Sequence, residues 1–101
     1  MKSKLLIIED NNEDIEIAVS ALREAGEDFD YTTAGSLSEA LWELECSPKY
    51  AFDKIYIDLG LKDIKRSPKE VLQVLTRYVG SLENIIVVCN DMKDCREAAQ
   101  H

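Results

Sequence analysis

Short apolar runs alternate with segments of helical periodicity along this chain, and that alternation restricts the fold more than any other feature. The runs cover residues 4–9, 29–34, 54–59 and 85–89. They are too short for buried helices, and β-branched or aromatic residues are frequent in them, so we predict strands. Strands that alternate with helices predict an α/β fold, in which a parallel sheet carries helices on both faces and the crossovers are right-handed.

Capping residues indicate where the predicted helices begin. Asn11 or Asn12 can cap the first helix. Ser36, with Glu39 three residues later, forms a capping box for the second. The segment 67–70, Ser-Pro-Lys-Glu, combines a cap, a proline at the first helical position and a capping-box glutamate. These caps therefore predict where the first three helices begin.

Carboxylates stand at the ends of two of the predicted strands. Glu9 and Asp10 end the first strand, and Asp58 lies near the end of the third. The carboxyl ends of parallel strands meet at one edge of the sheet, where such folds place their ligand crevice. Carboxylates that are crowded together repel one another unless a proton or a cation neutralises them. The pattern therefore predicts a hard divalent cation, which prefers oxygen ligands.

Length and charge exclude several classes of function. A chain of 101 residues is expected to form a single domain, residues 1–101. The net charge of −8 argues against nucleic acid or an anionic membrane as a partner, because both require a basic surface. No apolar run is long enough to span a membrane.

The cysteines and the N-terminal residues indicate a compartment. Cys46, Cys89 and Cys95 are odd in number and lack the spacing of metal ligands, which is typical of a reduced, cytoplasmic protein. Residues 1–4 lead into an apolar run too short for the core of a signal peptide. We therefore expect a cytoplasmic location.

The stretches KLLIIEDNNEDIE, from Lys4, and IYIDLGL, from Ile55, resemble the receiver domain of two-component response regulators. The SLSEAL stretch after the second strand belongs to the same resemblance, which covers nearly the whole chain. It implies a three-layer, flavodoxin-like sheet with strand order 2-1-3-4. The sequence ends before the fifth strand and last helix of a receiver, so we expect both to be lacking.

The resemblance also implies roles for particular residues. Asp58 would accept a phosphoryl group from a histidine kinase or a phosphotransfer protein. Asp10 and Asp58 would bind Mg²⁺ directly, Glu9 would bind it through water, and the backbone carbonyl of Gly60 would complete the protein ligands. A carboxylate attacks an anionic phosphoryl group poorly unless a cation offsets the repulsion. Such a domain is a signalling module that acts through protein–protein contacts, not an enzyme.

The chain also departs from the receiver pattern. Cys89, or Val88 if the register shifts by one, stands where receivers carry Thr or Ser. A thiol is a weak hydrogen-bond donor and valine provides none. The lysine of the fifth strand has no counterpart, and Lys62 replaces a customary proline. The cation-binding half of the site is therefore expected to be intact, and the phosphoryl-binding half impaired.

Three functions remain open. The first is a phosphoacceptor receiver, and the second is a degenerate receiver that binds partners independently of phosphorylation. The third, a Mg²⁺-dependent phosphohydrolase, usually needs a second acid where Gly60 stands. Simpler interpretations are also open: Glu9 and Asp10 as acids before a helix cap, Asp58 as a turn residue, and Cys89 as a small buried apolar residue.

Two sets of residues remain. Tyr50, Tyr56 and Tyr78 are expected in the core or at its boundary. The strand at 85–89 contains no charge or proline and is predicted to form an edge of the sheet. A last, weak helix after Asp91 offers it little cover. We therefore expect a homodimer, or a partner bound through this strand and the last helix.

Overall fold

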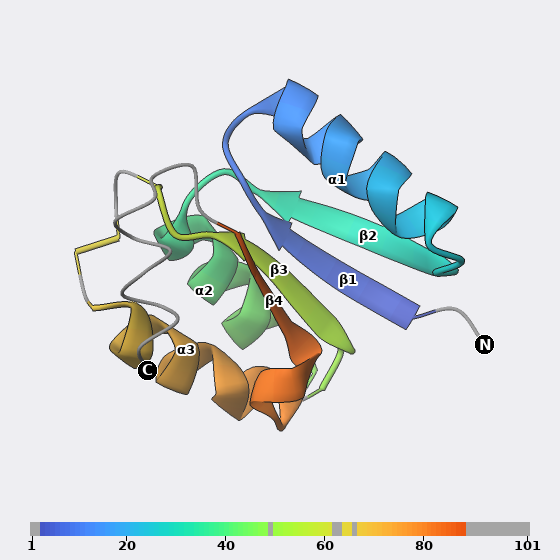
Figure 1. The fold of residues 1–101 in the computed structure, drawn as a ribbon. Helices are drawn as coiled ribbons and strands as arrows, with labels where there is room; N and C mark the ends of the chain where they lie inside the picture. Colours follow the sequence, from blue (N-terminus) through green and yellow to red (C-terminus); the bar gives the residue numbers. More distant parts are fainter. Residues whose placement is uncertain (1–2, 49, 62–63, 66, 89–101) are drawn as a thin grey trace.

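The computed structural model describes residues 3–48, 50–61, 64, 65 and 67–88. Its strands form one parallel sheet in the order β2-β1-β3-β4, and three helices and a 3₁₀ turn connect the strands (Figure 1). The strands are β1 (Ser3–Ile8), β2 (Phe29–Ala34), β3 (Lys54–Asp58) and β4 (Ile85–Val88). The helical elements are α1 (Asn12–Glu24), α2 (Leu37–Cys46), α3 (Pro68–Val79) and the 3₁₀ turn η1 (Leu82–Asn84). The predicted α/β, flavodoxin-like fold and its strand order are confirmed.

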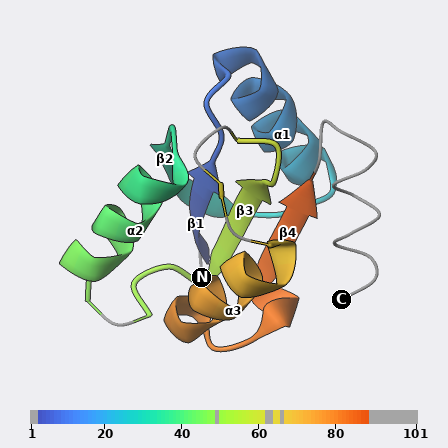
Figure 2. The ribbon, with the colours of Figure 1, turned by 90° about the vertical axis from the view of Figure 1, so that its left-hand side faces the viewer.

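The helices cover the two faces of the sheet and make three layers. Helix α1 packs on one face, whereas α2 and α3 pack on the other (Figures 1 and 2). Alternate residues of β1 serve the two layers: Leu5 and Ile7 face α1, and Leu6 and Ile8 face α2 and α3. All four side chains are buried, as expected for a strand in the middle of a parallel sheet.

The caps form at the predicted residues. Asn11, not Asn12, caps α1, because its Oδ1 accepts from the backbone N–H groups of residues 13 and 14 at 2.8 and 3.1 Å. Ser36 Oγ accepts from Glu39 N–H at 3.1 Å. In turn, Glu39 Oε2 accepts from Gly35 N–H at 3.2 Å, one residue before the cap. Ser67 Oγ accepts from the N–H of Glu70 at 3.3 Å and starts α3.

Asp53 links the N-terminal ends of β1 and β3, which lie at the edge of the sheet away from Glu9 and Asp58. Asp53 N–H donates to the carbonyl of Lys4 at 2.8 Å, and Asp53 Oδ2 accepts from Lys4 N–H at 2.8 Å. Lys4 also extends over the ring of Phe52. These contacts fix the two central strands against each other before the ladder begins, so their far ends emerge in a defined register.

The structure also differs from the sequence-based expectations. The first and third strands end one residue earlier than predicted, and the 3₁₀ turn before β4 was not predicted. Tyr50 is not a core or boundary residue; it is exposed, with a left-handed φ of 59°. Cys89 and the predicted last helix after Asp91 lie outside the described residues. Among the helices that the structure describes, none is long and apolar enough to cross a membrane.

The packing of α3 allows a test of the core. Leu75 is fully buried against the sheet, whereas Leu82 in the 3₁₀ turn is exposed. Leu75→Ala should lower the free energy of unfolding by about 2–5 kcal/mol, because it removes buried apolar atoms and leaves a cavity. The matched control, Leu82→Ala, should change it by no more than about 0.5 kcal/mol. Urea unfolding followed by circular dichroism measures both, and equal effects would contradict the described packing of α3.

Candidate functional site

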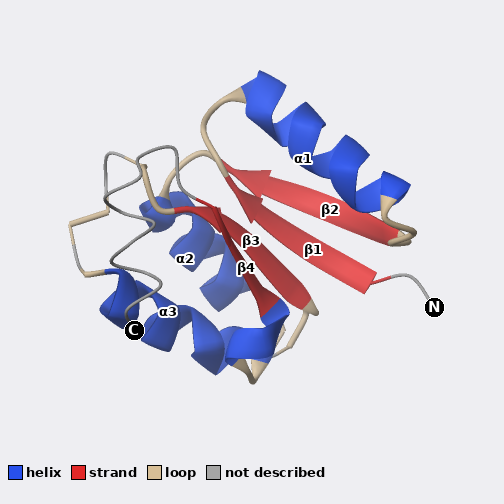
Figure 3. Cartoon of the chain, viewed as in Figure 1, coloured by secondary structure: helices blue, strands red, loops and turns tan. Residues whose placement is uncertain are grey.

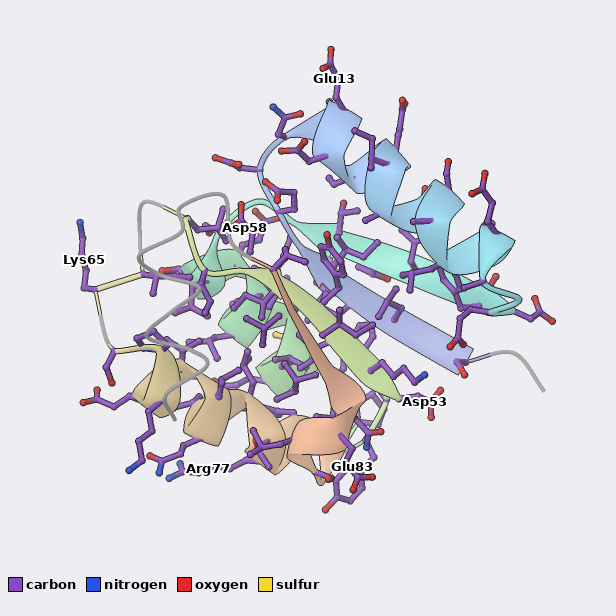
Figure 4. All side chains as sticks on the ribbon, viewed as in Figure 1. Glu13, Asp53, Asp58, Lys65, Arg77 and Glu83 are labelled. Atoms are coloured by element: carbon purple, nitrogen blue, oxygen red, sulfur yellow. The ribbon has the colours of Figure 1, made fainter. Side chains whose placement is uncertain are left out.

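Two neighbouring strands bring carboxylates to the same edge of the sheet. In the parallel ladder of β1 and β3, Ile8 pairs with Ile57. Glu9 follows Ile8 and Asp58 follows Ile57, so these two residues occupy equivalent places on adjacent strands. Figure 3 shows that the loops after both strands leave the sheet on this side. Figure 4 shows Asp58 at this end of β3 and Asp53 at the opposite end.

Both carboxylates are buried. Glu9 is 3% exposed and Asp58 is 2% exposed, and they are the only buried polar residues in the part of the chain that the structure describes. An ionised carboxylate that leaves water is destabilised unless it is paired, hydrogen-bonded or neutralised. Two of them side by side repel each other as well. The fold therefore concentrates its unfavourable electrostatics at a single place.

Hydrogen bonds offset part of this cost. Glu9 Oε1 accepts from the backbone N–H groups of Asp10 at 3.0 Å and Asn11 at 3.3 Å. Asp58 Oδ1 accepts from Gly60 N–H at 2.8 Å. The carboxyl group of Glu9 is also hydrogen-bonded to the side chains of Asp58 and Asp10. A hydrogen bond between two carboxyl groups requires a proton on one of them.

The pKa of Glu9 is raised. Burial is the largest cause, and the hydrogen bonds of Glu9 to Asp58 and Asp10 and the negative charge of Asp58 act in the same direction; the net result is a pKa of about 7 instead of 4.5. The N–H of Asn11 acts in the opposite sense, because it stabilises the ionised form. Near neutral pH, both the protonated and the ionised form of Glu9 are therefore populated.

The predicted site residues meet only in part. Glu9 contacts both Asp58 and Asp10, but Asp10 is exposed and Glu9 is the buried partner. Gly60 contributes its N–H to Asp58, and a role for its carbonyl stays a prediction. Val88 lies opposite Asp58 in the ladder, and its carbonyl accepts from the N–H of Leu59 at 3.0 Å. Cys89, predicted at the Thr/Ser position of receivers, is outside the described residues.

The oxygen ligands of this carboxylate cluster suit Mg²⁺. Carboxylate oxygens are the ligands that hard divalent cations prefer. Burial and the acidic neighbours Asp58 and Asp10 raise the pKa of Glu9, and a cation would relieve the same repulsion. In the described residues, however, no group of three or more acidic, His or Cys side chains is arranged as a metal site. Cation binding by Glu9, Asp10 and Asp58 therefore requires their side chains to reorient, and it stays a prediction.

Sequence reasoning assigned no role in the site to Tyr56. This residue lies on β3 two positions before Asp58, and its phenol is half-buried. Burial raises the pKa of Tyr56, as do the negative charges of Glu9, Asp58 and Asp14. The alternation of strand side chains is the signal that could have found it, because residues two apart point to the same face.

The buried Glu9 makes stability depend on pH in a defined direction. Its folded pKa lies above the unfolded value, so the folded state binds more protons, and stability falls as pH rises from about 4.5 to 7. Glu9→Gln keeps a donor toward Asp58 and cannot ionise. It should therefore be more stable than the wild type by at least about 1 kcal/mol at pH 8, with a smaller difference at pH 5.

Urea unfolding of both proteins at pH 5, 6, 7 and 8 tests this prediction. The matched control is Glu13→Gln, at an exposed position in the first turn of α1. Any change that it causes should be the same at every pH in this range. A difference between Glu9→Gln and wild type that does not vary with pH would contradict the proposed state of Glu9.

Several known structures with a similar arrangement of strands and helices are described as response regulators. A response regulator receiver protein from Pseudomonas putida is 19% identical, with a TM-score of 0.66, and the match covers 99% of this chain and 79% of that one. The bacteriophytochrome response regulator AtBRR is 25% identical, with a TM-score of 0.62 and coverages of 99% and 76%. The phosphorylated cyanobacterial phytochrome response regulator RcpA is 23% identical, with a TM-score of 0.64 and coverages of 99% and 75%.

The likeness is in structure more than in sequence. No protein-family model matches the chain, and no curated protein matches it in sequence. The matched structures nevertheless agree with it over nearly its whole length. The strand order β2-β1-β3-β4, the helices on both faces and the acids beyond β1 and β3 all agree with the resemblance that the sequence indicated. The chain has the fold of a response regulator receiver domain.

Proposed function

We propose that this chain is a phosphoacceptor receiver domain in which Asp58 is the acceptor. The observation that carries the proposal is the pair of buried carboxyl groups, Glu9 and Asp58, side by side at the carboxyl ends of β1 and β3. A cluster of this kind destabilises the folded state, so a functional role explains its presence better than a structural one does. The structural likeness to response regulators, one of which is described as phosphorylated, supports the same function.

The proposed reaction transfers a phosphoryl group from a phosphohistidine to Asp58. A carboxylate oxygen of Asp58 forms the new bond to phosphorus, the bond between phosphorus and the imidazole nitrogen breaks, and that nitrogen keeps the electron pair. Gly60 N–H holds the Asp58 carboxylate in place through its 2.8 Å hydrogen bond. Mg²⁺, bound by Glu9, Asp10, Asp58 and the Gly60 carbonyl, would offset the charge of the acceptor and of the phosphoryl oxygens.

The partner is a histidine kinase or a phosphotransfer protein. The outer face of α1 suits its docking, because α1 starts just beyond the pocket and exposes an apolar side chain there: Ile17 is 66% exposed. A shallow hollow around Ile17 is lined by Glu13, Glu16 and Glu24, which would favour a basic rim on the partner. A homodimer or a second partner bound through strand 85–89 stays a prediction.

The second candidate function is that of a degenerate receiver. Val88, opposite Asp58, offers no side-chain donor to a phosphoryl group. Lys65, on the loop after β3, is exposed and points away from Asp58 (Figure 4). Loss of a positioned donor typically costs about 10²–10³ in rate. Phosphorylation of Asp58 is therefore expected to be slow, and a domain that is never phosphorylated would act by binding alone.

Labelling with a small phosphodonor separates the two functions. The chain, incubated with Mg²⁺ and acetyl phosphate, should slowly gain the mass of one phosphoryl group, because Asp58 stands at the acceptor position that the resemblance to receivers implies. Asp58→Asn should abolish the gain. The matched control is Asp53→Asn, at the opposite end of β3 (Figure 4). It should label as the wild type does, since the amide oxygen of asparagine can still accept from Lys4 N–H.

The outcomes of labelling are distinct. A wild type that gains no mass, with Mg²⁺ bound, would favour the degenerate receiver. Labelling that persists in Asp58→Asn would move the acceptor to another residue and contradict the proposal.

Cation binding is testable by itself. Mg²⁺ in the millimolar range should raise the melting temperature, because it binds the native pocket and relieves the repulsion there. The shift should be larger at pH 8 than at pH 6, since at pH 6 a proton on Glu9 competes with the cation. Asp58→Asn should raise stability without Mg²⁺ and weaken the response to it. Differential scanning fluorimetry measures these shifts, and a melting temperature that Mg²⁺ leaves unchanged would refute the cation site.

A further inference from the structure

Tyr56 shares a face of the sheet with Asp58. In the ladders, Tyr56 pairs with Ile7 of β1 and with Ile86 of β4. Ile7 belongs to the apolar cluster under α1, and Tyr56 packs against the same cluster. Its neighbours in the strand, Ile55 and Ile57, point the other way, into the core under α2 and α3. The phenol of Tyr56 and the carboxylate of Asp58 therefore project on the α1 side of the sheet, one strand repeat apart.

The ring of Tyr56 packs against apolar side chains, and its hydroxyl has no hydrogen-bond partner among the described residues. Packing against Ile7 and its cluster holds the ring, and the residue as a whole is half-buried. Among the residues that the structure describes, none forms a hydrogen bond with the Tyr56 hydroxyl, and no buried polar side-chain atom lacks a partner. The hydroxyl therefore remains within reach of solvent or of a ligand. A phenol held by its ring loses little further entropy when its hydroxyl bonds to something.

The surroundings of this hydroxyl are acidic. The charges of Glu9 and Asp58 act on it from the pocket, and that of Asp14 acts on it from the first turn of α1. A neutral phenol has one O–H group, and toward an anion it can act only as a donor. Across from Asp58, Val88 supplies no donor of its own. Within the described part of the chain, a phenol without a hydrogen-bond partner thus lies on the same strand face as Asp58.

We propose that the Tyr56 hydroxyl is an anion-binding group of this pocket and donates a hydrogen bond to an oxygen of the anion bound at Asp58. The identity of that anion as a phosphoryl group rests on the proposed function. Tyr56 thereby supplies, from within β3, a side-chain donor that Val88 does not provide. Its contribution appears only when the anion is present, because the hydroxyl makes no hydrogen bond to the described residues without it.

The test uses the phosphoryl mimic beryllofluoride, which requires no transfer chemistry. Tyr56→Phe retains the ring and its packing and removes only the hydroxyl. It should bind beryllofluoride in the presence of Mg²⁺ about tenfold more weakly than the wild type, the effect of one hydrogen bond to a charged group. Its affinity for Mg²⁺ alone should be unchanged. Tyr31→Phe is the matched control, since Tyr31 is on the same face of the sheet, on β2, and is exposed.

Isothermal titration calorimetry gives both affinities. Equal binding of beryllofluoride by Tyr56→Phe and wild type would overturn the proposal, and so would a wild type that binds none. Equal weakening of Mg²⁺ and beryllofluoride binding would also overturn it, because that pattern indicates a structural role. Wild type that binds beryllofluoride through Tyr56 but is not labelled by acetyl phosphate would contradict the proposed function and leave this inference standing.

A second measurement does not depend on the variant. In the wild type labelled with ¹³C at the tyrosine ζ carbon, beryllofluoride with Mg²⁺ should shift the Tyr56 resonance, and Mg²⁺ alone should shift it less. The Tyr31 resonance should not move in either case. A Tyr56 chemical shift that beryllofluoride leaves unchanged would refute the hydrogen bond, even if Tyr56→Phe failed to fold.

Discussion

The properties of the candidate site depend on the repulsion between two carboxyl groups that the fold buries side by side. Glu9 and Asp58 meet because β1 and β3 are parallel neighbours whose apolar residues fix their register. Once the strands are packed, neither acid can retreat into water, so a proton or a cation must accompany them. The hydrogen bonds from Asp10, Asn11 and Gly60 reduce the cost but do not remove it. The core thus supplies the force that holds the site in an electrostatically unfavourable state.

Much of this arrangement could be predicted from the sequence because it depends on local chemistry. The order of strands and helices follows from hydrophobic periodicity, and the caps at Asn11, Ser36 and Ser67 follow from side chains that satisfy free N–H groups. The meeting of the acids of β1 and β3 follows from topology. The resemblance to receivers then gave the strand order, which the structure confirms.

Other features depend on contacts that the sequence does not specify. The sequence could not say which of the adjacent acids Glu9 and Asp10 is buried, because both follow the last residue of β1 and the turn decides between them. Tyr50 was predicted in the core or at its boundary, yet it is exposed, with a left-handed φ, and its ring lies beside Gly80. Tyr56 was treated as one aromatic among several, since its relation to Asp58 matters only when both are placed on the same strand face.

Asn11 joins the pocket to the helix that follows it. Its N–H donates to Glu9, while its side-chain oxygen caps α1. The positive end of the α1 dipole therefore begins at Asn11, the residue whose N–H is hydrogen-bonded to Glu9. A change in that charge alters the strength of the Asn11 N–H bond and the field at the first turn of α1 together. Through Asn11, the stability of α1 at the protein surface therefore depends on whether the buried carboxylates are protonated, bound to a cation or ionised.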